Sequence, residues 1–323
     1  MNWHLNYTPP DSLVKISHKD KIMMMGSCFT ENIGEKLSDY KFQTVVNPNG
    51  ILFNPISIVN AIHSYIKNDD VIRTGNNNDL FFSFDHHGSF SKHSEQELKT
   101  EILSARKQAH NFLKEARFLI ITFGSAFVYH HIKTDQIAAN CHKLPAQEFK
   151  KELLTVEAIV SQYNSLIKEL KKFNPDLNII FTISPVKYLR DGIIENNISK
   201  STLLLSANLL RTANSELPTF YFPAYELVND DLRDYRFYKE DMAHPNEQAI
   251  NYVWEKFANT YFTTETKTLN EKIKEINSAA SHRPIHSDTE AHKKFKNTYL
   301  QKCEQLEKQF PALDLKKEKE TFN

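Results

Sequence analysis

Residues 21–34, KIMMMGSCFTENIG, contain the segment that decides the fold. The apolar run Lys21–Met25 ends at Gly26 and predicts a short buried strand. Apolar side chains then recur four apart within 29–40, which is the spacing of an amphipathic helix. A strand that continues directly into a helix is typical of a βαβ unit, so this segment favours a parallel sheet.

The rest of the chain repeats this alternation. We expect a hairpin insertion within 68–94 and a second strand pair at 127–132 and 136–140. Most of the other predicted strands are apolar throughout, which is typical of a sheet covered on both faces. Those strands lie at 42–46, 118–123, 177–183 and 219–222, and the helices at 55–66, 95–115, 146–172, 199–214 and 245–262.

Composition excludes several classes of protein. The 323 residues are 40% hydrophobic and 25% charged, which is typical of a folded globular chain and not of a disordered one. The 40 basic and 40 acidic residues balance, so there is no electrostatic sign of a nucleic-acid or membrane partner. Three widely spaced cysteines predict no disulfide framework. With no secretory signal and no apolar run of membrane length, a cytoplasmic location is expected.

The sequence changes character near residue 265, where it becomes charged and helical with a break at 282–287. We therefore expect two parts, a main domain at 1–264 and a helical extension at 265–323. Such an extension suits oligomerisation or the binding of a partner.

Three of the seven glycines, Gly26, Gly50 and Gly124, follow predicted strands. In an open parallel sheet, ligands bind beyond the carboxyl ends of the strands, so these turns predict a site at one edge. The alternative is that each glycine only lets the chain turn. The polar or thiol side chains expected at that edge are Ser27, Cys28, Asn47, Asn49, Ser125 and Ser184.

Two short motifs carry the candidate chemistry. Ser27 and Cys28 precede a predicted helix, whose free N–H groups can stabilise a thiolate or an oxyanion. Neither a dinucleotide-binding nor a Walker A spacing is present there, which disfavours a nucleotide ligand. Asp241 lies three residues before His244 and can orient the imidazole as a general base. In the alternative interpretation, Asp241 caps the following helix.

The segments GSCFTENIG and VVNPNGILFNP together resemble the GSCFA-domain family, a branch of the SGNH (GDSL-type) hydrolase superfamily. The resemblance spans about residues 1–262 and includes ANCHKLP at 139–145, SPVKYLRDG at 184–192 and LRDYRFYKEDMAHP at 232–245. It implies a three-layer α/β/α sandwich with a mainly parallel sheet. It also implies an esterase or acyltransferase that needs no cofactor and acts on an acyl ester, O-acetyl on a small-molecule or glycan alcohol.

Position by position, the resemblance implies roles for individual residues. Cys28, not Ser27, takes the place of the nucleophilic serine, and Asp241 and His244 match the terminal dyad. Gly50 matches the glycine whose backbone N–H helps to form the oxyanion hole. We expect His244 and the helix amino terminus to lower the pKa of the thiol, so that it alkylates fast.

One block departs from the superfamily pattern. Where Gly-x-Asn is expected, the chain has Gly124-Ser125-Ala126, so the amide that donates to the oxyanion is missing. Losing one such donor lowers kcat by about 10²–10³. Ser125, Asn47 or Asn49 can substitute for it. The alternative is a protein that binds a glycan or acyl ligand without turning it over.

Other residues are weaker candidates. His142 is expected to line the pocket. Arg236 can clamp an anionic substrate group, or pair with Asp234 and hold its own loop. The adjacent histidines at 86–87 and 130–131 point to opposite faces of a strand, so we expect no metal site.

Overall fold

The computed structural model describes residues 5–213, 216–284 and 289–323. Its centre is a five-stranded sheet in the order β10-β9-β5-β1-β2, with every neighbouring pair parallel. Counted along the chain this is the order 2-1-3-4-5 of doubly wound folds, which reverses between β1 and β5. The strands are β1 (Lys21–Gly26), β2 (Gln43–Val46), β5 (Phe118–Phe123), β9 (Asn178–Ile183) and β10 (Thr219–Phe222).

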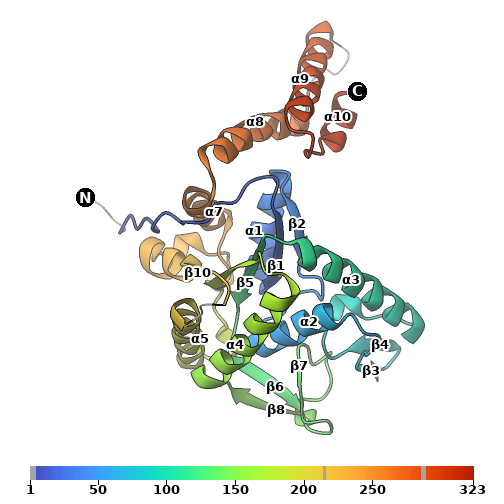
Figure 1. Cartoon of the computed structure of the whole chain (residues 1–323), viewed down its shortest axis with the longest axis vertical. Helices are drawn as coiled ribbons and strands as arrows, with labels where there is room; N and C mark the ends of the chain where they lie inside the picture. Colours follow the sequence, from blue (N-terminus) through green and yellow to red (C-terminus); the bar gives the residue numbers. More distant parts are fainter. Residues whose placement is uncertain (1–4, 214–215, 285–288) are drawn as a thin grey trace.

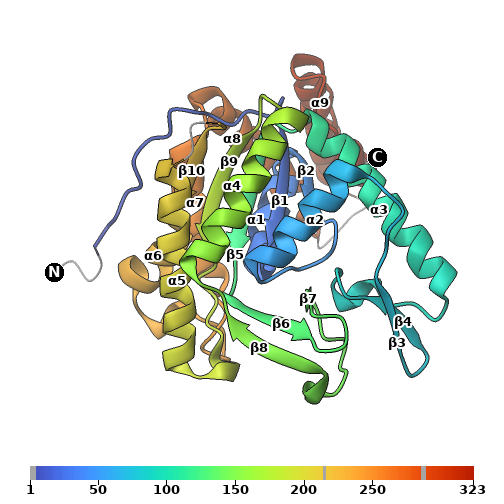
Figure 2. The same cartoon turned by 60° about the horizontal axis from the view of Figure 1, so that its bottom comes forward.

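Helices cover both faces of this sheet and confirm the three-layer α/β/α sandwich (Figures 1 and 2). The apolar run of β1 alternates between the two cores: Met23 and Met25 pack on one face, Ile22 and Met24 on the other. This alternation explains why the strand has no polar side. One face carries α2 (Pro55–Lys67), α3 (Glu95–Glu115), α4 (Val156–Phe173) and α5 (Ile193–Ala213); the other carries α1 (Cys28–Asp39) and α7 (Glu247–Tyr261).

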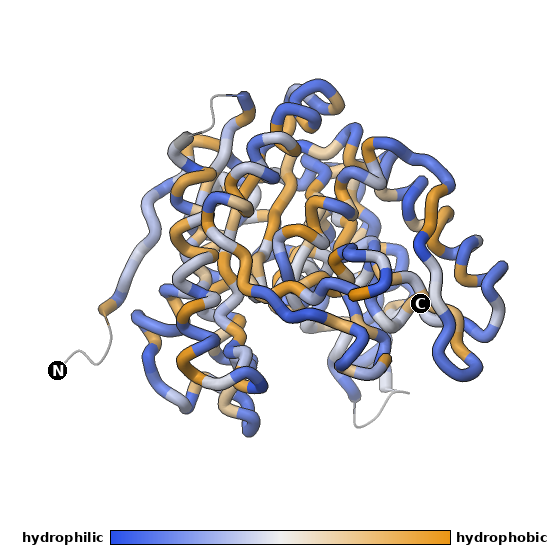
Figure 3. Tube along the Cα trace, turned by 90° about the horizontal axis from the view of Figure 1, so that it is seen from below, coloured by the Kyte–Doolittle hydropathy of each residue, from blue (hydrophilic) through white to orange (hydrophobic). Residues whose placement is uncertain are grey.

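Hydropathy follows these layers. In Figure 3 the hydrophobic residues are concentrated along the central strands and the inner faces of the helices, with hydrophilic residues around them. Of the helices that the structure describes, none combines the length and the hydropathy that a membrane span requires. The remaining short helical turns are η1 (Gly88–Phe90), η2 (Ala146–Glu148), η3 (Leu189–Asp191), α6 (Ala224–Glu226), η4 (Leu227–Leu232) and η5 (Tyr235–Phe237).

Two small antiparallel sheets lie beside the sandwich. The predicted hairpin insertion is confirmed as β3 (Thr74–Asn77) with β4 (Leu80–Ser83). The predicted strand pair is confirmed as β6 (Phe127–His131) with β7 (Gln136–Ala138), and β8 (Phe149–Leu153) is added on the other side of β6.

Two predicted helices have different bounds. The helix predicted at 146–172 is wrong over its first ten residues, because pairing with β6 makes a strand of 149–153. The helix α4 begins only at Val156, where the Thr155 side chain caps it. The helix predicted at 199–214 begins earlier, at Ile193.

The carboxyl-terminal part is a group of three helices, α8 (Thr264–Ser281), α9 (Glu290–Gln309) and α10 (Lys316–Phe322), with an apolar cluster of its own. It projects from one end of the sandwich (Figure 1). Lys41 Nζ bonds Glu318 Oε1 at 2.7 Å and joins α10 to the end of α1. The helical extension is therefore confirmed; of its predicted break, residues 285–287 lie outside the described residues.

Candidate active site

The turn between β1 and α1 presents Cys28 at the carboxyl edge of the sheet. Gly26 has φ +139, and a Cβ there would overlap the carbonyl oxygen of Thr122 on β5, so only glycine fits. Ser27 is buried and caps α1 by accepting from Phe29 N at 3.3 Å. Cys28, the first residue of α1, is half-buried. The thiol is therefore the more accessible of the two candidate nucleophiles.

The surroundings of Cys28 keep its thiol protonated. Burial is the largest cause that raises its pKa, and the nearby carboxylate of Glu31 adds to it. The backbone N–H groups of Cys28 and Phe29 and the charge of Lys200 act in the opposite direction but are weaker. The expectation of a lowered pKa is thus wrong, because desolvation outweighs the helix terminus.

The Asp241–His244 pair forms as predicted from its spacing. His244 Nδ1 lies 2.6 Å from Asp241 Oδ2, and the backbone N–H groups of Ala243 and His244 each donate to Asp241 Oδ1 at 2.9 Å. The pKa of Asp241 is held far below its usual range. The largest cause is the bond from the His244 backbone N–H, and the second is the bond from the Ala243 N–H. An ionised Asp241 fixes the ring so that Nε2 is directed away from it. The alternative of a helix cap is wrong, since Asn246 caps α7.

The loop of this dyad lies against the segment that follows β9. Lys187 N donates to Ala243 O at 3.1 Å, and the Lys187 ammonium sits 3.9 Å from the centre of the Tyr238 ring. Burial, and next the charge of Cys28, raises the pKa of the adjacent Tyr188. The same segment thus borders both the dyad and the thiol.

The dyad is open to solvent. The side chains of His244 and Asp241 are 44% and 50% exposed. Among the described residues, no hydrogen bond joins the His244 imidazole to Cys28 or Ser27. Catalytic hydrogen bonds are often long or unformed without a substrate and tighten when it binds.

Several of the expected oxyanion donors are engaged elsewhere. Gly50 N donates to Asn47 O at 2.7 Å inside its own turn. The Asn49 side chain accepts from the Tyr65 hydroxyl at 2.7 Å and donates to Asp85 O at 3.1 Å. Both groups therefore have partners away from the thiol.

The Ser125 hydroxyl is also engaged elsewhere. It accepts from Phe127 N at 3.1 Å and lies 3.4 Å from Ser199 Oγ on α5. The backbone N–H groups of Gly124 and Ser125 both donate to Phe53 O, at 2.8 and 2.9 Å. Neither residue directs a donor to the thiol in this arrangement.

Asn47 remains at the edge next to the nucleophile turn. Its Oδ1 accepts from Gly26 N at 2.9 Å, and its Nδ2 reaches Glu31 Oε1 only at 3.5 Å. A bond this long leaves the amide able to turn to another acceptor. Asn47 is therefore the candidate amide that bonds residues on both sides of Cys28, Gly26 before it and Glu31 after it.

The two weaker candidates are placed differently. His142 stacks on Phe82 with ring centres 4.2 Å apart and bonds Ser83 O at 2.8 Å, so it packs against the β3–β4 insertion. Arg236 bonds Asp234 through two side-chain nitrogens, at 2.9 and 2.7 Å, as in the alternative that the pair holds its own loop. Within residues 5–213, 216–284 and 289–323, no three potential metal-ligating side chains lie together.

Sequence reasoning missed Lys200. Its side chain is buried, and Nζ donates to Gly124 O and Ser184 O at 2.7 Å each. These carbonyls directly follow β5 and β9, so the ammonium lies beneath the strand ends. A lysine near the start of an amphipathic helix looks like a solvent-facing residue, and no motif around Lys200 indicates otherwise.

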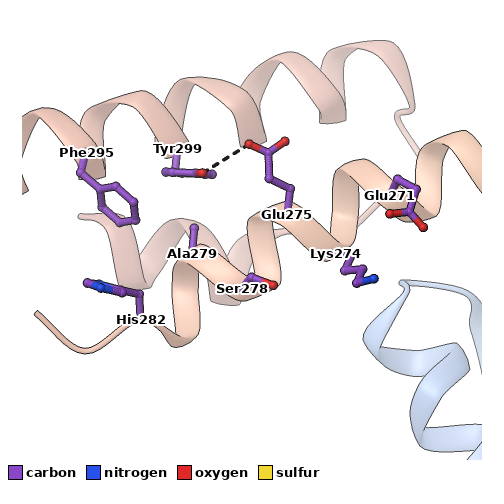
Figure 4. A pocket seen from close by; sticks show the side chains of 8 residues that line it. All are labelled: Glu271, Lys274, Glu275, Ser278, Ala279, His282, Phe295 and Tyr299. Carbon is purple, nitrogen blue, oxygen red and sulfur yellow. Dashed lines mark hydrogen bonds between the residues drawn. The ribbon is translucent and has the colours of Figure 1, made fainter. Parts of the chain in front are cut away.

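Hollows are also present outside this edge. One, of about 470 Å³, is formed in the carboxyl-terminal helices, where Phe295 and Tyr299 of α9 lie opposite Ala279 of α8 and His282, which follows α8 (Figure 4). Another, of about 460 Å³, lies beside α2 and includes Asn49. Neither hollow is lined by the thiol or the dyad.

Comparisons with known proteins identify the family of this chain. Residues 21–257 match the GSCFA family, and residues 273–323 match the carboxyl-terminal domain of GSCFA domain proteins. No curated protein matches the sequence. Solved structures similar to this chain include a carbohydrate esterase family 3 protein from Talaromyces cellulolyticus (TM-score 0.35, 9% identity, 79% of this chain and 99% of that one). Another is a mutant acetyl esterase with an acetate ion (TM-score 0.35, 9% identity, 80% and 99%).

Proposed function

Because this chain belongs to the GSCFA family, we propose that it hydrolyses or transfers an acyl ester, with O-acetyl on a carbohydrate-like alcohol as the expected substrate. The observation that carries the proposal is the arrangement at the carboxyl edge of the sheet. There the Cys28 thiol starts α1, and an imidazole oriented by a carboxylate at 2.6 Å lies on the neighbouring loop. A nucleophile, a base and an orienting acid are the parts of a catalytic triad.

In this mechanism Cys28 Sγ attacks the carbonyl carbon while His244 Nε2 takes the thiol proton. The tetrahedral intermediate collapses to a thioester on Cys28, and His244 returns the proton to the leaving alcohol. Water or an acceptor alcohol then attacks the thioester, giving its proton to His244, and the acid or the new ester departs from the regenerated thiol. Asp241 keeps the imidazole oriented and stabilises its charged form.

The raised pKa of Cys28 determines how the first step runs. A protonated thiol is a weak nucleophile, so proton transfer to His244 has to accompany the attack. We expect the backbone N–H of Cys28 and Asn47 Nδ2 to receive the oxyanion, since the Gly50 and Gly124 N–H groups already have acceptors.

The experiment compares two neighbouring substitutions in turnover of p-nitrophenyl acetate. Cys28→Ala is expected to abolish turnover, because it removes the attacking atom. Ser27→Ala is expected to keep part of the activity, because Ser27 caps a helix from a buried position. Full loss in Ser27→Ala together with activity in Cys28→Ala would overturn the assignment of the nucleophile.

A second candidate function is binding of an acyl or glycan ligand without turnover. It is favoured by the raised pKa of the Cys28 thiol and by the dyad's lack of a bond to it. Calorimetry with an O-acetylated sugar distinguishes the two functions. Binding with no release of acetate supports this candidate, and acetate release that depends on Cys28 excludes it.

A further inference from the structure

Lys200 is a buried cation that the triad does not use. Only 2% of this residue is exposed, and lysine is rarely buried so fully without a partner. Its partners are two carbonyl oxygens, Gly124 O and Ser184 O, at 2.7 Å each. A protonated lysine carries three N–H donors, so these two bonds leave one more to direct.

The two carbonyls place the ammonium behind the nucleophile turn. Gly124 and Ser184 directly follow adjacent strands, β5 and β9, so one side chain ties both strand ends together. A Cβ built on Gly124 would lie 3.2 Å from Ser27 Cβ, so the fixed glycine contacts the residue that precedes Cys28. Lys200 therefore supports, through Gly124 and Ser27, the turn that carries the thiol.

Lys200 and Cys28 also interact by charge. The thiolate of Cys28 favours the charged form of Lys200, and Lys200 in turn favours the thiolate. Burial opposes the charged form of Lys200 more strongly and lowers its pKa to about 7. Within the part of the chain that the structure describes, Glu31 on α1 and Tyr188 after β9 also act on the thiol.

We propose that Lys200 is a positioning residue for Cys28, which fixes the ends of β5 and β9 and stabilises the negative charge that develops on Sγ. Its place in the reaction rests on the proposed function. Its coupling to Cys28 does not, because that coupling is measured without any substrate. The carboxylate of Glu31 disfavours a negative charge on the thiol, and a buried cation at this place supplies the opposite charge.

The first test measures the reaction of Cys28 with dithiodipyridine between pH 5 and 10 in the full chain and in Lys200→Met. Mass spectrometry follows the Cys28 peptide, with Cys141 as the internal control and Lys168→Met, an exposed lysine of α4, as the matched variant. In Lys200→Met, Cys28 is expected to react about tenfold more slowly at low pH, because a neighbouring positive charge has been removed. This difference shrinks toward none as the pH rises above about 7, because Lys200 of the unaltered chain then loses its charge.

The pH dependence separates the proposal from a purely structural role. A loosened turn changes the rate by the same factor at every pH, whereas a lost charge changes it only where Lys200 is protonated. A constant factor, or no change at Cys28, overturns the proposal. Turnover is a separate readout. Activity in Cys28→Ala would refute the proposed function, whereas the coupling of the two side chains is decided by the thiol reaction alone.

A second measurement covers the case in which Lys200→Met does not fold. The NMR signal of the Lys200 side chain, labelled with ¹³C at Cε, is titrated in the unaltered chain and in Cys28→Ala. If the two side chains are coupled, the Lys200 ammonium loses its proton at a lower pH in Cys28→Ala, because no thiolate is present to favour the charged form. Identical titrations in the two proteins would contradict the proposal.

Discussion

Cys28 and His244 are held at the same edge of the sheet in different ways. The thiol follows a buried strand in a turn where a single Cβ would strike the next strand, and a buried lysine lies behind it. The imidazole stands on an exposed loop and is fixed by one carboxylate. Named for their proposed roles, the nucleophile half around Cys28 depends on the fold, whereas the base half around His244 depends on a local motif.

The largest expected effect is on the exposed half. His244→Ala should lower kcat for p-nitrophenyl acetate by about 10²–10⁴, the range contributed by general acid–base catalysis. Its free energy of unfolding should change by no more than about 0.5 kcal/mol, because the side chain is exposed. Chemical denaturation and initial rates test both statements, with the exposed His93→Ala as the control. If the free energy of unfolding fell by as much as the activation free energy rose, His244 would be as important for the fold as for turnover, and the contrast between the halves would be wrong.

The nucleophile half should respond to substitution through stability. Gly26→Ala is expected to lower the free energy of unfolding by about 2–4 kcal/mol, from a strained positive φ and from overlap with Thr122 O. Gly88→Ala is the matched control, since its φ is not positive and its added Cβ meets only Asn140 Nδ2 at 3.8 Å. Urea denaturation measures both variants. Equal stability in the two would show that the turn is not constrained.

A smaller effect is expected at the cap of α1. Ser27→Ala removes the bond from Phe29 N and should lower the free energy of unfolding by about 1 kcal/mol. Ser27→Thr keeps an accepting oxygen and is the matched variant for thermal denaturation. A stability unchanged by Ser27→Ala would show that the hydroxyl does not hold the turn.

The smallest effect concerns the link between the two halves. Lys36 of α1 bonds Glu247 at the start of α7 at 2.9 Å, and Glu247 is largely exposed. Lys36→Ala should therefore lower the free energy of unfolding by less than about 1 kcal/mol. Double-mutant analysis with Glu247→Ala measures the coupling. A coupling well above this value would mean that the halves are joined more firmly than their exposure indicates.

The sequence predicted the elements that carry a clear local pattern. The strands at 118–123 and 219–222 and the helix at 95–115 have the predicted bounds, because their apolar spacing agrees with their packing. The strand at 149–153 was missed because FKKEL is compatible with a helix, and only pairing with β6 makes it a strand.

The candidate site was predicted in part, for a similar reason. The Asp241–His244 bond depends on a short loop, which its spacing anticipates. The partners of Asn49 lie 16 and 36 residues away and Ser199 lies 74 residues from Ser125, so the direction of these side chains is set largely by packing that no motif shows. The raised pKa of Cys28 depends on burial, and the place of Lys200 on the ends of two strands; both arise only in the folded chain.

The central claim is that Cys28 carries the acyl group, and rapid acid quenching with p-nitrophenyl acetate tests it directly. Mass spectrometry of the quenched protein is predicted to show one acetyl group on the peptide that contains residues 22–36, with fragmentation placing it on Cys28. As a thioester it should be removed by neutral hydroxylamine, and Cys28→Ala should lack it. An acetyl group on Ser27, or turnover with no acetyl group on this peptide, would contradict the account.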